Sequence, residues 1–177
     1  FMQKRLGVDV ALYGDDDSVI YPRQGKAAFV AVVMKTQEPS EIAARILEGK
    51  LRWRSELELI DCTGGWGSGV IDSLRMAGHS PMRVEFSGKA TKPEYFNKRA
   101  QMYWEMSIWL KEGGVLPPDP ELLSELTATT YTLKNGKFII EPKDLIKAKI
   151  GRSPDRADAL ACTFYIADQP GRKDSPF

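Results

Sequence analysis

The chain has 177 residues, of which 42% are hydrophobic and 28% charged, and its formal net charge is +1. This length and composition suit a single domain with a sizeable core over residues 1–177, and a near-neutral charge excludes a global basic field for nucleic acid. No run approaches the roughly 18 apolar residues of a membrane span. No secretory signal is recognisable, and Cys62 and Cys162 lack the spacing of a zinc site or disulfide framework, which favours a reducing, cytoplasmic setting.

The first predicted element is a strand over residues 5–12 with an aspartate in its interior. Its apolar side chains at even positions face one side, and Gly7, Asp9 and Ala11 face the other. Strand interiors are depleted in Asp, so Asp9 needs a partner or a cation. We expect its two small neighbours to leave room for a metal ion, its waters and a phosphate.

The remaining elements follow in an order that predicts a mixed α/β fold. Strands over 18–23 and 27–34 complete three consecutive antiparallel strands, and strands over 56–61 and 82–86 flank a helix over 70–77. Helices are predicted from Pro39 to about Gly49 and over 95–111, 121–126, 142–150 and 153 to about 168. Asn135-Gly136 predicts a hairpin between 129–133 and 137–141, and a tail from about 169 to 177 is expected to be frayed. The prediction is one mixed sheet, with an antiparallel opening and a parallel extension, helices packed against it and an additional β-hairpin.

Three aspartates fall at the ends of these elements. Asp9 lies on the first strand, Asp61 ends the strand over 56–61, and Asp158 lies in the first turn of the last helix. Ligand sites in parallel sheets gather at the carboxyl ends of the strands, so pairing of the two strands would bring Asp9 and Asp61 together. Carboxylate ligands suit Mg²⁺ or Mn²⁺ rather than zinc, and two such ions can catalyse phosphodiester displacement without a His or Cys nucleophile.

Each aspartate also has a purely structural interpretation. Asp9 could be paired within the sheet, Asp61 could cap the helix that follows, and Asp158 could be a first-turn acid favoured by the helix dipole. Asp155, three residues before Asp158, competes with it for a ligand role. The local patterns alone leave these alternatives open.

Together, three motifs resemble a known family. They are Gly7-Val8-Asp9-Val10-Ala11 with Gly14-Asp15-Asp16; Ile60-Asp61 with Gly64, Gly67 and Gly69; and Gly151 to Leu160, which contains Ser153-Pro154-Asp155-Arg156-Ala157-Asp158. In this order they resemble the nuclease domain of the large terminase subunit of tailed bacteriophages, over nearly the whole chain. The last motif is the most specific.

The resemblance implies an RNase H-like fold and a two-metal endonuclease that cuts double-stranded DNA during genome packaging in the cytoplasm of the infected host. By motif match, Asp9, Asp61 and Asp158 take the places of the metal-binding triad, and Asp15 is an auxiliary acid near the metals, with Asp155 a second candidate for such a role. Implied partners are the ATPase domain of the same subunit, the portal and the small terminase subunit. Nothing in this chain resembles that ATPase domain, since the glycines from Gly64 to Gly69 lack a phosphate-loop Lys, so no nucleotide cofactor is expected.

A basic run lies between the predicted hairpin and the last helix. Adjacent to a phosphodiester site, such a run is expected to contact DNA phosphates, and the hairpin could line or gate the groove. The aromatic residues of the 95–111 helix are interpreted as core rather than as base-stacking platforms. The predicted DNA-binding residues are Lys143, Lys147, Lys149, Arg152 and Arg156.

The sequence therefore predicts a metal-dependent endodeoxyribonuclease with little sequence specificity, because no base-reading motif is present. Two alternatives stay open. One is another RNase H-like nuclease, such as a junction resolvase. The other is a non-catalytic domain that docks on DNA or the portal, in which the acids are structural.

Overall fold

The computed structural model describes residues 1–11, 16–35 and 38–172. Its strands are β1 (Lys4–Asp9), β2 (Ser18–Gln24), β3 (Ala27–Ala28), β4 (Val32–Met34), β5 (Leu57–Asp61), β6 (Met82–Val84), β7 (Tyr131–Lys134) and β8 (Lys137–Ile140). Its α-helices are α1 (Pro39–Trp53), α2 (Ser68–Met76), α3 (Lys98–Lys111), α4 (Pro120–Ala128), α5 (Lys143–Ile150) and α6 (Asp155–Cys162), with a short 3₁₀ turn, η1, at Thr63–Gly65.

The main sheet is mixed, as predicted. Its order is β3-β2-β1-β5-β6, and β4 also pairs with β2. β1 is antiparallel to β2 and parallel to β5, and β5 is parallel to β6. The register sets Val8 opposite Ile60, so the strand ends that carry Asp9 and Asp61 are neighbours.

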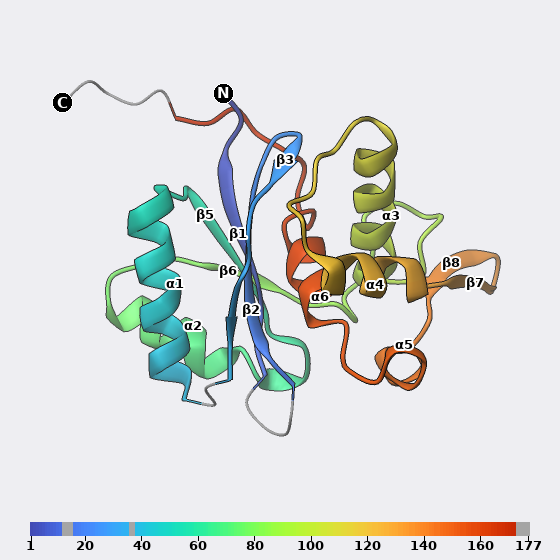
Figure 1. The fold of residues 1–177 in the computed structure, drawn as a ribbon, viewed down its shortest axis with the longest axis horizontal. Coiled ribbons are helices and arrows are strands. Elements are labelled where there is room, and N and C mark those ends of the chain that lie inside the picture. The colour runs from blue at the N-terminus through green and yellow to red at the C-terminus, as the bar shows by residue number, and fades with distance from the viewer. Residues whose placement is uncertain (12–15, 36–37, 173–177) are drawn as a thin grey trace.

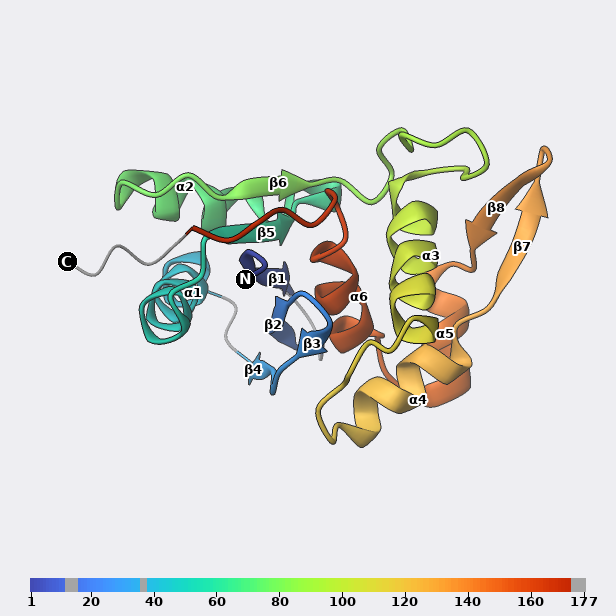
Figure 2. The same cartoon turned by 90° about the horizontal axis from the view of Figure 1, so that it is seen from above.

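Helices cover both faces of this sheet (Figure 1). α1 and α2 lie on one face, while α6 and α3 lie on the other, with α4, α5 and the β7–β8 hairpin beyond them (Figure 2). The alternation of β1 explains this, because Leu6 and Val8 belong to the core beneath α1 and α2. Gly7 faces α6, which approaches so closely that a Cβ at Gly7 would lie 2.0 Å from the Ala159 carbonyl oxygen. The room expected beside Gly7 is thus filled by a helix, so the expectation was wrong at Gly7, whereas Ala11 lines a hollow beside Asp9.

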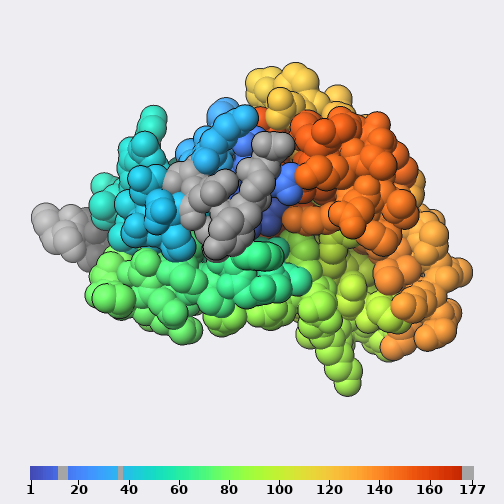
Figure 3. Space-filling view, turned by 90° about the horizontal axis from the view of Figure 1, so that it is seen from below, coloured from blue at the N-terminus to red at the C-terminus, as the bar shows by residue number. Residues whose placement is uncertain are grey.

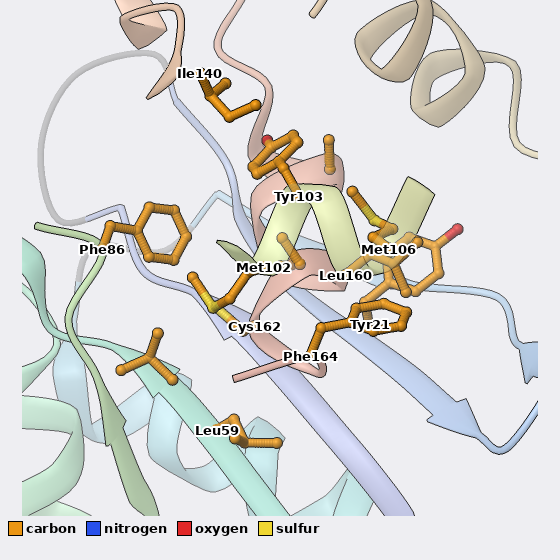
Figure 4. Close-up of a cluster of buried hydrophobic side chains, with 14 of the residues drawn as sticks. Tyr21, Leu59, Phe86, Met102, Tyr103, Met106, Ile140, Leu160, Cys162 and Phe164 are labelled. Carbon is orange, nitrogen blue, oxygen red and sulfur yellow. The ribbon is translucent and has the colours of Figure 1, made fainter. Parts of the chain in front are cut away.

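A second core lies between the sheet and the α6 side (Figure 4). Leu59 of β5, Tyr103 of α3 and Leu160 of α6 are buried there together. Tyr103 and Trp109 are buried as predicted, but Trp104 is only half-buried and stacks on Phe138 of the hairpin, with ring centroids 4.3 Å apart. The hairpin is therefore attached to α3 through an aromatic contact.

Several element boundaries differ from the sequence prediction: β1 ends at Asp9 and α3 begins at Lys98, and three further differences have an identifiable cause. The predicted strand over 27–34 is divided into β3 and β4, and the carbonyl of Pro22 on β2 accepts from Phe29 at the division. Pro22 has no N–H to donate to this edge, which explains the interruption. Helix α1 continues past Gly49 to Trp53, since Trp53 packs against the core.

The third difference is that α6 ends at Cys162 instead of near residue 168. Two fully buried arginines of the sheet take the carbonyl groups that a longer helix would use. Arg5 and Arg23 both donate to the carbonyl of Thr163, and Arg5 also donates to that of Ile166. Asp168 pairs with both guanidinium groups, at 3.2 and 2.5 Å.

Residues 169–172, in the predicted frayed tail, contact the start of the chain. Gln169 accepts from the Gln3 N–H, Met2 pairs with Pro170, and Arg172 donates its N–H to Glu56. Among the helices of the described residues, none is long and apolar enough to cross a membrane.

Candidate functional site

The carboxyl ends of β1 and β5 meet α6 at one end of the sheet. Asp9 and Asp61 end these adjacent strands, and Asp158 comes from the helix packed over β1. Figure 3 looks onto this end of the molecule, where the blue end of β1 lies between the teal residues after β5 and the orange α5. The three aspartates thus converge, as the strand pairing predicts.

Asp9 is buried, and its environment disfavours its negative charge. Burial, followed by repulsion from Asp158 and Asp61, holds the pKa of Asp9 well above its usual range, although Lys143 opposes this rise. A buried carboxylate at the end of a strand, whose ionisation is disfavoured, destabilises the fold. Such a group gains most from a cation.

Asp61 is held by the turn that follows it. Its Oδ1 accepts from the N–H of Thr63 at 2.9 Å and from the Thr63 hydroxyl at 2.6 Å. The Thr63 Oγ1 in turn accepts from the Phe86 N–H, which fixes the turn to the end of β6. Asp61 does not cap α2, whose N-cap residue is Gly67. Burial raises the pKa of Asp61, and the two Thr63 bonds oppose the rise.

Asp158 is fully buried among donors from two other elements. Tyr103 of α3 donates its hydroxyl to Oδ1 at 2.5 Å, and Arg99 Nη2 lies 3.5 Å from the same oxygen. Burial alone would raise the pKa of Asp158, but Lys143 and Arg99 outweigh it, so that the pKa is lowered. Asp158 is the one of the three aspartates whose pKa lies below its usual value. The helix-dipole interpretation does not account for these three partners.

Lys143, which the sequence predicts as a DNA contact, lies inside the carboxylate cluster. Its Nζ is 2.7 Å from Asp158 Oδ2 and 3.2 Å from Asp9 Oδ2. Burial opposes the charge of this ammonium, but attraction to Asp158 and Asp9 exceeds that penalty and raises its pKa well above the usual value. The lysine cation thus lies between two of the three acids.

Asp155 faces a different side of the same site. Its Oδ2 accepts from the Asp17 N–H at 3.0 Å. With Asp9, Asp16 and Lys143 it lines a hollow of about 310 Å³. The auxiliary candidate Asp15 lies outside the described residues.

A larger cavity of about 450 Å³ opens on the other side of Lys143. Asp9 and Asp61 lie at its base, and Ile139 and Ile140 of β8 form part of its wall. The hairpin therefore lines the site. This is one of the two roles that the sequence predicts for it, the other being to gate the groove. Sequence patterns did not reveal that Arg99 and Tyr103 belong to the site, because their contacts with Asp158 depend on the packing of α3 against α6. They did not reveal the apolar wall of the cavity either.

The other four basic residues of the predicted DNA surface all have acidic partners. Lys147 contacts Asp16 and Lys149 contacts Glu141, each at 2.7 Å. The remaining two face α4, where Arg152 pairs with Glu125 and Arg156 with Glu121. These ion pairs connect α5 to Asp16 and Glu141, and the residues from Arg152 to Arg156 to α4.

The site has the donor chemistry for a hard divalent cation but not a formed coordination shell. Aspartate oxygens are ligands that Mg²⁺ and Mn²⁺ prefer. Within the described ranges, however, no three His, Cys, Asp or Glu side chains are arranged so that they could hold a metal ion. The Lys143 ammonium contacts Asp9 and Asp158 instead.

Comparison with solved structures places this fold in the RNase H-like class. The neighbours are nuclease domains of phage large terminase subunits, which confirms the resemblance at the level of fold. The domain of gp2 from bacterial virus Sf6 has a TM-score of 0.74 and 21% identity, over 90% of this chain and 87% of that one. A mutant of that domain with manganese has a TM-score of 0.72 and 20% identity, over the same shares. The nuclease from thermophilic phage G20c with bound magnesium has a TM-score of 0.70 and 16% identity, over 92% and 80%. No family model and no curated protein matches the sequence.

Proposed function

We propose that the chain is a divalent-metal-dependent endonuclease domain that cleaves double-stranded DNA, with little sequence specificity, during phage genome packaging. The observation that carries this proposal is the convergence of Asp9, Asp61 and Asp158 around the Lys143 ammonium, at the carboxyl ends of two parallel strands. The fold shared with terminase nuclease domains supports the same reaction class.

The proposed ligands are Asp9, Asp61 and Asp158, with Asp155 and Asp15 as auxiliary acids. When bound, Mg²⁺ or Mn²⁺ ions supply the charge and the activated water that phosphodiester hydrolysis needs, and two ions suit the in-line displacement. Asp9, Asp61 and Asp158 would hold the ions, and Lys143, which now pairs with Asp9 and Asp158, would have to release those carboxylates. Its side chain is 37% exposed, so the ammonium has a route to solvent and to a substrate phosphate.

The chain's own groups have distinct roles in this proposal. Tyr103 and Arg99 orient Asp158, and the Thr63 turn orients Asp61, so two of the three ligands are held by hydrogen bonds before a metal ion arrives. Lys143, Lys147, Lys149, Arg152 and Arg156 remain proposed DNA contacts. Their acidic partners imply that phosphate has to compete for them, which predicts strong dependence on ionic strength. We propose the ATPase domain of the subunit, the portal and the small subunit as partners, in the host cytoplasm.

Cleavage of supercoiled plasmid tests the proposal. The wild type is expected to nick and linearise the plasmid with Mn²⁺ or Mg²⁺ and not with a chelator. Asp9→Asn, Asp61→Asn and Asp158→Asn should each abolish cleavage, whereas Asp72→Asn, on the exposed side of α2, should retain it. Retained activity in all three variants would exclude the assigned site. Activity in Asp158→Asn alone would move the ligand role to Asp155.

The two rivals make different predictions in the same assay. A junction resolvase would cut branched DNA and leave linear duplex intact. A docking domain would bind DNA without cutting it under any metal condition.

A further inference from the structure

We propose that the 450 Å³ cavity receives one unstacked nucleotide of the strand being cut, and that Trp66 is the surface on which its base stacks. This inference rests on the proposed nuclease function. It specifies the state of the DNA that the site binds, namely a locally unpaired strand rather than an intact helix.

The cavity has the size and wall of a ligand pocket. Its volume falls within the ~300–1,000 Å³ typical of small-molecule sites. Phe86, Ile139 and Ile140 line it beside Asp9 and Asp61, and Figure 4 shows Phe86 and Ile140 on separate elements at one end of the core. The outside of a duplex presents phosphates and sugars, which gain little from apolar walls. A base that has left the stack presents an apolar face to them.

Trp66 stands at the mouth of this cavity on a constrained turn. It is 49% exposed and borders both the 450 Å³ cavity and the hollow beside Asp155. Gly67 is held against the chain, since a Cβ there would lie 2.1 Å from the Asp61 carbonyl oxygen. The turn therefore fixes Trp66 relative to Asp61. A half-exposed indole on a constrained turn beside a phosphodiester site offers a surface on which a base can stack.

Polar groups inside the cavity can bind the edge of a base. The Oδ1 of Asn97 accepts from the Ala100 N–H as the cap of α3, so the Nδ2 donors of its amide remain for a ligand. Arg99 lines the same cavity, and its guanidinium adds positive charge there.

A nucleotide in this cavity would place its phosphate toward Asp9 and Asp61. The enzyme then needs less energy to bind DNA that is already unpaired, because no base pair and no stack must be broken. Only the paired duplex has to supply this unpairing and unstacking energy, so the preference for unpaired DNA should be about five-fold or more.

The test compares two end-labelled duplexes of the same length with Mn²⁺, one fully paired and one with a central mismatched bubble. The wild type is expected to cut within the bubble at least about five-fold faster than the same position in the paired duplex. Trp66→Ala should lose this ratio, and Trp66→Phe should keep most of it. Leu51→Ala, an exposed apolar control on α1, should keep it fully. Equal cutting of both duplexes by the wild type, or an unchanged ratio in Trp66→Ala, would overturn the inference.

A binding measurement separates this inference from the nuclease proposal. 2-Aminopurine in the bubble should be quenched on binding Asp9→Asn, which is expected not to cut, and not on binding Asp9→Asn/Trp66→Ala. If the wild type cuts neither duplex, the nuclease proposal fails, while the quenching still decides whether Trp66 stacks on a base. Equal quenching by both proteins would reject the role of Trp66.

Discussion

Lys143 decides how the carboxylate cluster behaves before a metal ion binds. Its ammonium contacts Asp9 and Asp158, so it neutralises part of their charge and competes with any cation for the same oxygens. The fold thereby avoids three buried like charges without a partner. Metal binding is then an exchange of one cation for another.

Replacing this lysine should change metal affinity and stability in opposite directions. Without metal, Lys143→Met should lower the melting temperature, because Asp9 and Asp158 lose their shared partner. With Mn²⁺, the melting temperature should rise more than that of the wild type, and calorimetry should show tighter binding. Lys149→Met, which removes a more peripheral pair with Glu141, should leave Mn²⁺ affinity unchanged. Weaker Mn²⁺ binding by Lys143→Met would contradict this account.

Tyr103 should act on Asp158 through its hydroxyl alone. Tyr103→Phe keeps the ring in the core but removes the 2.5 Å donor to Oδ1. The free energy of unfolding in urea should fall by about 1–3 kcal/mol, since the hydrogen bond is to a buried charged group. Tyr131→Phe, in an exposed part of the hairpin, is the control and should change it little. An unaltered free energy for Tyr103→Phe would show that this bond is unimportant.

The residues of the site were only partly predictable. Asp61 follows from a strand end, Asp158 from the start of a helix and Asp9 from its unusual place in a predicted strand, all of which are local patterns; that β1 ends at Asp9 is visible only in the structure. The donors to Asp158 are 55 and 59 residues away in sequence, on α3. Their charge and aromatic character fit a surface or a core equally well, so only the packing of α3 on α6 reveals their role.

At the scale of elements, the contact between β1 and α6 positions Asp158 over Asp9. Gly7 makes this contact possible, and its lack of a side chain is a packing requirement. Gly7→Ala should destabilise the protein by about 1–3 kcal/mol or more in chemical unfolding, because the backbone oxygen of Ala159 has to move. It should also weaken Mn²⁺ binding.

The matched control lies in helix α1. At Gly49, the nearest atom to an added Cβ is 3.6 Å away, so Gly49→Ala should instead stabilise the protein by about 0.5–1 kcal/mol. A Gly7→Ala protein as stable as this control would contradict the close packing of α6.

Elements were predicted better than their ends. Periodicity and turn residues predict the order of strands and helices, the parallel pairing of β1 with β5 and the Asn135-Gly136 hairpin. The ends depend on distant groups. Trp53 packs on the core where α1 continues past Gly49, and Arg5 and Arg23 bind the carbonyl of Thr163, the residue that follows α6. A local sequence pattern cannot identify these partners, because they lie far away in the sequence.

For the whole molecule, one buried acid should give stability a recognisable pH dependence. Glu125 of α4 accepts from the Ala157 N–H and pairs with Arg152, and burial raises its pKa to about 7. Between its unfolded value near 4.5 and about 7, the folded state binds more protons than the unfolded state. Stability should therefore fall as the pH rises through this window, by on the order of 3 kcal/mol from this group.

Melting temperatures from pH 5 to 8 test this dependence. Glu125→Gln cannot titrate, so its melting temperature should fall less steeply over that range, although the variant is less stable at every pH because Arg152 loses its partner. The Glu121→Gln variant, on the exposed side of α4, is the control with a wild-type slope. An unchanged slope in Glu125→Gln would contradict the assignment.

The central claim is that Asp9 binds a metal ion and lowers the stability of the metal-free protein. Thermal unfolding of Asp9→Asn with and without Mn²⁺ tests this claim most directly. Burial and repulsion disfavour the charged form of Asp9, so the metal-free variant should melt at or above the wild-type temperature. Mn²⁺ should raise the melting temperature of the wild type and not that of Asp9→Asn. A variant that is less stable than the wild type without metal, and that responds to Mn²⁺ as the wild type does, would show that Asp9 is a structural residue.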